Sequence, residues 1–171
     1  MANTYTLIAS STVGSGGAAY VEFTSIPSTY TDLAIFLSAR SNIAQTINGV
    51  FLKFNNTSQS TNWTRRQLEG GDGSVGSSNS TTAIAGYANG NSATANTFSN
   101  HFIYIPNYAS SNYKSVSIDT VVEGNAANGY YVDLIAELWS NTAAINQVTL
   151  VSDSVNFMQY TTAYLYGISN S

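Results

Sequence analysis

The stretch "FIYIPNYASSNYKSVSIDT" (residues 102–120) decides the fold, because it contains two extended segments joined by a proline-marked corner. In its second half, Val116 and Ile118 fall on one side and Ser117 between them falls on the other. A period of two is typical of a β-strand that is packed on one face and wet on the other. Proline cannot donate a hydrogen bond to a neighbouring strand, so Pro106 suits a strand end. The stretch therefore predicts a strand, a corner and a second strand.

The same alternation recurs along the chain. Leu33, Ile35 and Leu37 fall on one side of a strand expected at 32–40. Clusters of Gly, Ser, Asn and Asp separate the extended segments, as turns require. The segments expected to form strands are 4–10, 18–25, 32–40, 48–55, 62–69, 82–87, 98–105, 114–123, 129–139, 145–152 and 162–168.

These segments predict an all-β protein, a two-sheet antiparallel β-sandwich of jelly-roll type with about ten strands. Residues 1–171 are expected to form a single β-sandwich domain, with residues 1–10 as an N-terminal arm or an edge strand. Residues 69–80, rich in Gly and Ser, are expected to form an exposed, flexible hairpin loop. No segment has a convincing helical period, and residues 139–147 hold one helical turn at most.

Composition narrows the classes of function. Charged residues make up 8 % of the chain, against about 25 % in ordinary soluble domains, and Ser, Thr and Asn take their place. With five basic residues and a net charge of −4, the chain lacks the positive stripe that binds phosphates, so nucleic acid is not an expected partner. There is no cysteine, and neither a signal-peptide pattern nor a membrane-spanning apolar run is found. We expect synthesis in the cytoplasm, no membrane association, and exit only by a route such as cell lysis.

The residues that carry catalytic chemistry elsewhere are sparse. His101 is the only histidine, and we interpret it as a structural or surface residue, because no nucleophile motif accompanies it. The acids Asp119, Glu123, Asp133 and Glu137 lie on two strands expected to be neighbours, and paired carboxylates are how glycosidases act. We interpret them as charges that keep a strand surface soluble. No catalytic residue, metal ligand or cofactor is therefore expected, and the chain is predicted not to be an enzyme.

Several large apolar side chains fall on strand faces that should be wet. Their cover is expected to come either from the second sheet or from another subunit. We take them as candidate self-association contacts: Phe36, Phe51, Tyr131, Ile135 and Trp139. Tyr108, Tyr113 and Tyr160 lie near corners, where they either contact a sugar or partner protein or simply pack the corner.

Three quoted stretches carry a resemblance to a known family: "TYTLIASSTVGSGGAAYVEFTSIPSTYTDLAIFLSARSN" (4–42), "TANTFSNHFIYIPNYASSNYKSVSIDTVVEGNA" (94–126) and "QYTTAYLYGI" (159–168). Together they resemble a virion protein family of tailed phages that infect cyanobacteria. The resemblance spans nearly the whole chain, with 55–62 and 69–92 expected to vary. It contains no catalytic motif and implies a structural component of the virion.

The expected function is a capsid decoration (cement) protein on the exterior of the phage head. Such a protein would form a homotrimer and bridge neighbouring major capsid protein subunits, with residues 1–8 as an arm against the capsid. The alternative is a tail-fibre or receptor-binding module that recognises a host surface glycan. A third possibility, a glycan depolymerase, would use Glu123 or Glu137.

Overall fold

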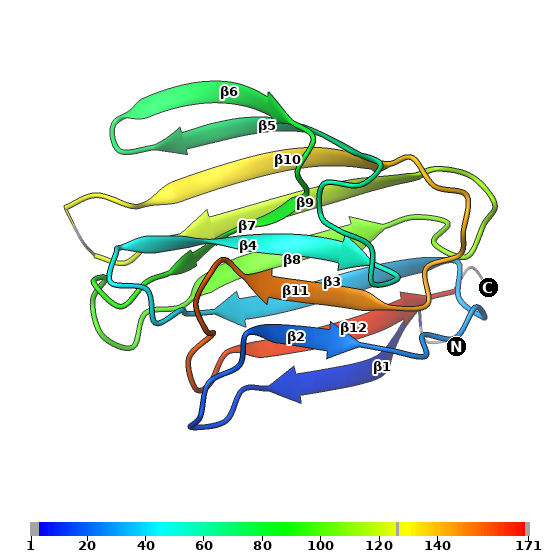
Figure 1. Ribbon diagram of the computed structural model, residues 1–171, viewed down its shortest axis with the longest axis horizontal. Coiled ribbons are helices and arrows are strands. Elements are labelled where there is room, and N and C mark those ends of the chain that lie inside the picture. Colours follow the sequence, from blue (N-terminus) through cyan, green and yellow to red (C-terminus); the bar gives the residue numbers. More distant parts are fainter. Residues whose placement is uncertain (1–3, 126, 170–171) are drawn as a thin grey trace.

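The computed structural model describes residues 4–125 and 127–169, and every regular element among them is a β-strand. Twelve strands form two antiparallel sheets, so the predicted all-β sandwich is confirmed, with one strand (Ser74–Ser80) beyond the eleven expected segments. The four-stranded sheet has the order β2-β11-β4-β7 and lies over part of the larger sheet, whose order is β1-β12-β3-β8-β9-β10-β5-β6 (Figure 1). The strands are β1 (Tyr5–Thr12), β2 (Tyr20–Phe23), β3 (Asp32–Ala39), β4 (Ile47–Phe54), β5 (Trp63–Gly71), β6 (Ser74–Ser80), β7 (Ile84–Asn89), β8 (Ser99–Ile105), β9 (Lys114–Val122), β10 (Tyr131–Trp139), β11 (Val148–Ser152) and β12 (Thr162–Ile168).

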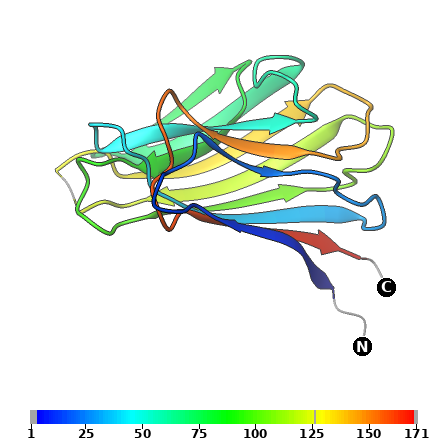
Figure 2. The same ribbon diagram turned by 60° about the horizontal axis from the view of Figure 1, so that its bottom comes forward.

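The strand order is that of a jelly roll with two inserted hairpins. An eight-stranded jelly roll pairs its strands in the orders 1-8-3-6 and 2-7-4-5. Here β1-β12-β3-β8 has the first order and β2-β11-β4-β7 has the second, once β5, β6, β9 and β10 are set aside. Those four strands continue the larger sheet beyond β8, and β5 and β6 extend past the smaller sheet (Figure 1). Figure 2 shows the first and last strands, β1 and β12, side by side at the opposite edge.

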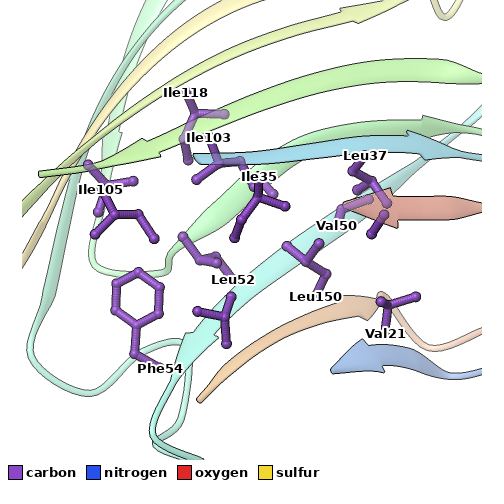
Figure 3. Close-up of a cluster of buried hydrophobic side chains, with 14 of the residues drawn as sticks. Val21, Ile35, Leu37, Val50, Leu52, Phe54, Ile103, Ile105, Ile118 and Leu150 are labelled. Atoms are coloured by element: carbon purple, nitrogen blue, oxygen red, sulfur yellow. The ribbon is translucent and has the colours of Figure 1, made fainter. Parts of the chain in front are cut away.

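The core lies between the two sheets, where the period of two places one apolar set from each strand. Leu33, Ile35 and Leu37 of β3 are at most 1 % exposed, as predicted from their alternation. They face side chains such as Leu52 and Leu150 from the smaller sheet (Figure 3). Ring packing closes one end of this core, where Phe54, Trp63 and Trp139 have centroids 5.0–6.2 Å apart.

The faces of β10 are the reverse of those expected. Ile135 pairs with Ile118 of β9 and Trp139 pairs with Trp63 of β5, and all four side chains point inward. Since successive side chains of a strand alternate, Val132 and Leu134 must then point outward. The prediction of Ile135 and Trp139 as contact residues is therefore wrong: they are 1 % and 0 % exposed, because the chain's own second sheet and inserted strands cover them.

Residues 69–80 are not a loop, which corrects a second expectation. Asp72 and Gly73 both have positive φ, 48° and 77°, which is the geometry of a two-residue type I′ turn. The turn joins β5 to β6 in unbroken register from Gly71↔Ser74 to Arg65↔Ser80. The Gly- and Ser-rich composition hid this strand, because β6 has almost no apolar alternation.

The predicted corners are confirmed and lie next to each other. The hydroxyl of Tyr108, just after Pro106, donates a hydrogen bond to the carbonyl of Pro27. The loop after β10 joins both corners: the backbone N–H of Ile26 donates to the Asn146 carbonyl, and the backbone N–H of Ile145 donates to the Tyr108 carbonyl. Residues 139–147, predicted to hold one helical turn at most, contain no helical turn. Of the expected N-terminal arm, residues 5–8 lie in the edge strand β1, and residues 1–3 lie outside the described residues.

Candidate functional site

The outer face of the larger sheet, defined as the side turned away from the smaller sheet, is the most extensive candidate surface. Cross-strand register aligns one outward residue from each strand into a row that crosses the whole sheet. The row is Ser10, Tyr164, Phe36, Phe102, Asp119, Leu134, Leu68 and Ser77. Most members are large and apolar, so this face differs from the polar outer face that a free sandwich usually presents.

One half of this face, over β9, β10, β5 and β6, forms an open apolar groove of about 850 Å³. We define the apolar groove by Leu68, Val75, Val121, Val132 and Leu134. All five side chains are exposed, from 45 % for Val121 to 90 % for Val75. Contiguous apolar exposure of this kind marks an interaction site, whereas single exposed apolar residues are ordinary.

The other half of the outer face carries an aromatic cluster, which we define as Tyr5, Phe36, Phe102, Tyr164 and Tyr166. Phe36 packs on Phe102 at 5.0 Å between centroids and meets Tyr166 edge-on at 5.8 Å and 88°. Tyr5 adds a further edge contact with Tyr166 at 6.2 Å. Edge-to-face contacts stabilise ring pairs, so these rings form a connected apolar cluster on the outer face.

Charge is scarce between these two halves. Asp119 lies in the row that crosses the sheet. Arg66 lies two residues before Leu68 on β5, and its guanidinium donates a hydrogen bond to the carbonyl of Arg65. At the rim, Asp32 accepts hydrogen bonds from the Tyr104 hydroxyl and the Asn107 amide, both at 2.8 Å. A partner that covers the centre of the face thus desolvates few ionised groups.

The remaining predicted contact residues lie on three different surfaces. Phe36 is 39 % exposed on the outer face and stays a candidate contact. Phe51 lies half-buried on the exposed side of the four-stranded sheet, paired with Val151 of β11. Tyr131 is half-buried at the start of β10, where its ring lies 5.5 Å from that of Tyr87 and its hydroxyl donates to Asp72. The structure therefore does not bring the five predicted residues together.

His101 is fully buried between the sheets and has a structural environment, as expected. Its Nδ1 lies 2.5 Å from the Ala85 carbonyl and its Nε2 lies 2.8 Å from the Ser99 hydroxyl. A carbonyl can only accept, so Nδ1 carries the proton of the neutral ring, while the Ser99 hydroxyl also lies 3.0 Å from the Ala39 carbonyl and donates to it. Burial lowers the pKa of His101 to about 4, which keeps the ring neutral at physiological pH.

The four acids considered for glycosidase chemistry do not form a pair. Asp119 points to the outer face, Glu123 is exposed at the end of β9, and Asp133 and Glu137 point inward. Glu137 accepts a hydrogen bond from the backbone N–H of Ile84 at 2.7 Å, and burial raises its pKa to about 8. Asp133 accepts from Gln67 at 2.8 Å, and burial raises its pKa as well. Both inward acids are only 2 % exposed, so the hypothesis of a depolymerase has no catalytic geometry in its favour.

The corner tyrosines separate into packing and surface residues. Tyr108 is fully buried, so for this residue the corner-packing alternative is correct. Tyr113 and Tyr160 are 58 % and 67 % exposed and remain candidates for surface contacts. In residues 4–125 and 127–169, no three His, Cys, Asp or Glu side chains are grouped as a metal site would require. The same residues contain no helix long and apolar enough to cross a membrane.

Comparisons with known proteins add little to this picture. No protein-family model matches the chain, and no curated protein matches it. Among solved structures, the crystal structure of Caenorhabditis elegans galectin LEC-6 is similar over 94 % of this chain and 96 % of that chain, with 6 % sequence identity and a TM-score of 0.33. We draw nothing about ligands from a similarity at this level.

Sequence reasoning missed the apolar groove, although one signal for it is present. Residues 129–139 carry apolar side chains in both alternating sets, so a strand with only one packed face would expose one of the two sets. Choosing the set with Val132 and Leu134 required knowing where β9 and β5 lie. Val75 gave no signal, since it stands alone among Gly, Ser and Asn.

Proposed function

We propose that this protein is a structural component of a virus particle, a capsid decoration protein that acts by burying the outer face of its larger sheet against other proteins. The observation that carries the proposal is the row across the outer face, in which Tyr164, Phe36, Leu134 and Leu68 are exposed, with the apolar groove at one end. The virion setting itself comes from the resemblance of residues 4–42, 94–126 and 159–168 to a phage virion family.

The size of the outer face suits this role. Eight strands about 4.8 Å apart, each with about seven residues rising about 3.3 Å, give a face of roughly 38 by 23 Å, or about 900 Å². A specific protein–protein interface buries about 800 Å² on each partner. The face is therefore large enough for one full interface, and repetition over a capsid lattice would raise the effective affinity.

Two measurements test the proposal. The copy number of the chain in purified virions, and its distribution between separated heads and tails, should show hundreds of copies that follow the heads. The purified 171-residue chain, added to heads that lack it, should co-sediment with them. A few tens of copies that follow the tails, or no co-sedimentation, would contradict the decoration role.

A variant locates the binding surface. Leu134→Asp places a charge at the centre of the outer face, where Leu134 is 52 % exposed, so the fold should persist and head binding should fall at least tenfold. The matched control is Ser58→Asp, which adds the same charge to an exposed loop away from this face. Equal binding by both variants would show that the outer face is not the contact.

The aromatic cluster favours a second candidate function, a receptor-binding module for a host glycan. Sugar rings stack on exposed aromatic faces, and Tyr164 and Phe36 lie paired and exposed on neighbouring strands. Binding of the full chain to glycans of the host surface, lost in Tyr164→Ala and kept in Leu134→Asp, would support this role over decoration.

A further inference from the structure

The sandwich has four sheet edges, and three of them are modified in ways that prevent pairing with another strand. At one edge β1 is interrupted by a bulge between Leu7 and Ala9. The edge strand β2 is four residues long. In β7 the register shifts beside Gly86, and the N–H of Ile84 is bonded by Glu137. Bulges, short strands and covered edges are the usual protections against edge-to-edge association.

The fourth edge, β6, has none of these protections. Its seven residues, SVGSSNS, include no charge and no proline, and its register with β5 is unbroken. Ser74 to Asn79 are all exposed, and Val75 is 90 % exposed. The structure describes no neighbour along its outer edge within residues 4–125 and 127–169. β6 is thus a neutral strand in unbroken register that is open to pairing.

The turn geometry determines which backbone groups are free. In a two-residue hairpin the pair that closes the turn, here Gly71↔Ser74, is hydrogen-bonded, and bonded pairs then alternate with non-bonded pairs. Gly76 and Ser78 therefore bond to β5. The N–H and C=O groups of Val75, Ser77 and Asn79 point away from β5, toward the open edge.

We propose that a second copy of this chain pairs with β6 across a two-fold axis, joining two larger sheets into one continuous antiparallel sheet. Centred on Ser77, the pairing places Ser77 opposite its counterpart and Val75 opposite Asn79 of the second copy. All the free groups on the edge are then bonded, and outward side chains stay on the same face. A two-fold arrangement uses the same strand from both copies, so it closes as a dimer.

Charge and surface continuity favour a second copy over another partner. The chain has a net charge of −4, yet β6 has no charged side chain, so no repulsion between like charges on the paired strands opposes self-pairing. Small side chains along β6 allow close approach of the backbones. Val75 lies at the end of the apolar groove, so pairing would bring the grooves of two copies toward each other on one extended outer face.

This inference does not depend on the proposed virion function, because it concerns an edge of the sheet and not the outer face. It replaces the homotrimer expected for a capsid decoration protein with a dimer. A three-fold arrangement would need β6 to pair with a different edge, and the other three edges are protected.

The experiment measures the mass of the 171-residue chain in solution by sedimentation, together with amide hydrogen exchange at single residues. The expected mass is twice 18.2 kDa at micromolar concentrations. In the dimer the amides of Val75, Ser77 and Asn79 should exchange slowly, and dilution to the monomer should release them. The amides of Gly76 and Ser78 should remain protected in both states, because they bond to β5.

Ser77→Pro removes the central outward N–H without removing a bond to β5, and proline is tolerated at the open side of an edge strand. Two intermolecular hydrogen bonds are lost by symmetry, so dimerisation should weaken on the order of 30-fold. A thermal unfolding transition checks that the variant is folded. Should it fail to fold, Ser77→Lys serves the same purpose, and Ser10→Lys on the protected edge β1 is its matched control.

A wild-type monomer or trimer would overturn the proposal. So would a dimer that survives Ser77→Lys, or one in which the amides of Val75, Ser77 and Asn79 exchange freely. A stable complex with a different protein along β6, with no self-association, would equally overturn it. If Leu134→Asp loses head binding but still forms the dimer, the outer-face contact and the β6 pairing are independent of each other.

Discussion

Lys114 is the residue whose surroundings are least expected from its chemistry. Its side chain is 1 % exposed, and its ammonium group donates hydrogen bonds to three backbone carbonyls, those of Ser110, Asn112 and Ala143, at 2.7–2.8 Å. The ammonium also lies 5.9 Å from the centroid of the Trp139 ring. A cation with three donors thus binds the proline corner to the loop after β10.

Replacing Lys114 with Met should therefore destabilise the fold. The substitution keeps the length of the side chain but leaves three carbonyls without their donor, at a cost of about 2–4 kcal/mol. Urea unfolding measures the loss. Lys53→Met, on the exposed side of β4, is the control and should change stability by less than about 0.5 kcal/mol; equal effects would mean that the three hydrogen bonds contribute little.

Glu137 should make stability decrease as pH rises. Its folded pKa of about 8 lies above the unfolded value of 4.5, so the folded state holds a proton that the unfolded state has lost. Stability from this group is therefore complete below pH 4.5 and is lost as pH rises toward 8. His101 has the opposite effect, but only between its folded pKa of about 4 and its usual 6.5. Between pH 6.5 and 8, His101 therefore contributes little to the change of stability with pH.

The test is Glu137→Gln, which resembles the protonated acid and does not titrate. Each pH unit in this interval corresponds to at most about 1.4 kcal/mol, so the wild type should be about 2 kcal/mol less stable at pH 8 than at pH 6.5, and the variant should show a flatter profile. Urea unfolding at both pH values gives the comparison. Glu123→Gln, at an exposed site, should leave the wild-type slope unchanged; parallel slopes for all three proteins would contradict the assignment.

At the scale of the element, β7 shows how the edge of the smaller sheet is held. Gly86 has φ of 99° and lies so close to Thr120 of β9 that an added Cβ would come within 2.4 Å of its side chain. Two residues earlier on the same strand, the backbone N–H of Ile84 donates a hydrogen bond to the carboxylate of Glu137. Backbone conformation, close packing and a side-chain hydrogen bond therefore combine to shape one edge strand.

Gly86→Ala should cost more than its backbone conformation alone explains. A positive φ costs an alanine about 1 kcal/mol, and the clash with Thr120 should add about 1–3 kcal/mol. Thermal and urea unfolding measure the total. Gly73→Ala is the matched control, because Gly73 also has positive φ, 77°, but has open space around it. Equal losses in the two variants would show that the Thr120 contact relaxes without cost.

At the scale of the whole molecule, the scarcity of charge should make stability insensitive to salt. The charged groups that matter most, Lys114, Arg40 and Glu137, are at most 4 % exposed and bond mainly to backbone groups, where salt screens little. Between 0.05 and 1 M NaCl the free energy of unfolding should change by less than about 1 kcal/mol. Urea unfolding at the two salt concentrations checks this, and a change of several kcal/mol would indicate that surface charges stabilise the fold.

The sequence determined by itself the class of the fold and most of its strands. Alternation of large apolar side chains with polar ones depends only on strand geometry, so residues such as Leu33, Ile35, Val116 and Ile118 identify both the strand and its buried side. The prolines at 27 and 106 placed the corners for a similarly local reason, since proline removes a donor from the ladder. Every expected strand was found because each carried such a local signal.

The tertiary structure alone decided which side of β10 is buried, that β6 is a strand, and where the exposed apolar groups gather. Residues 129–139 have two apolar sets, and only the register with Ile118 and Trp63 selects the one that contains Ile135 and Trp139. β6 has no alternation of its own and is ordered by a turn and by β5. Surfaces such as the apolar groove join strands far apart in sequence, so pairing between distant segments, which no local pattern encodes, determines them.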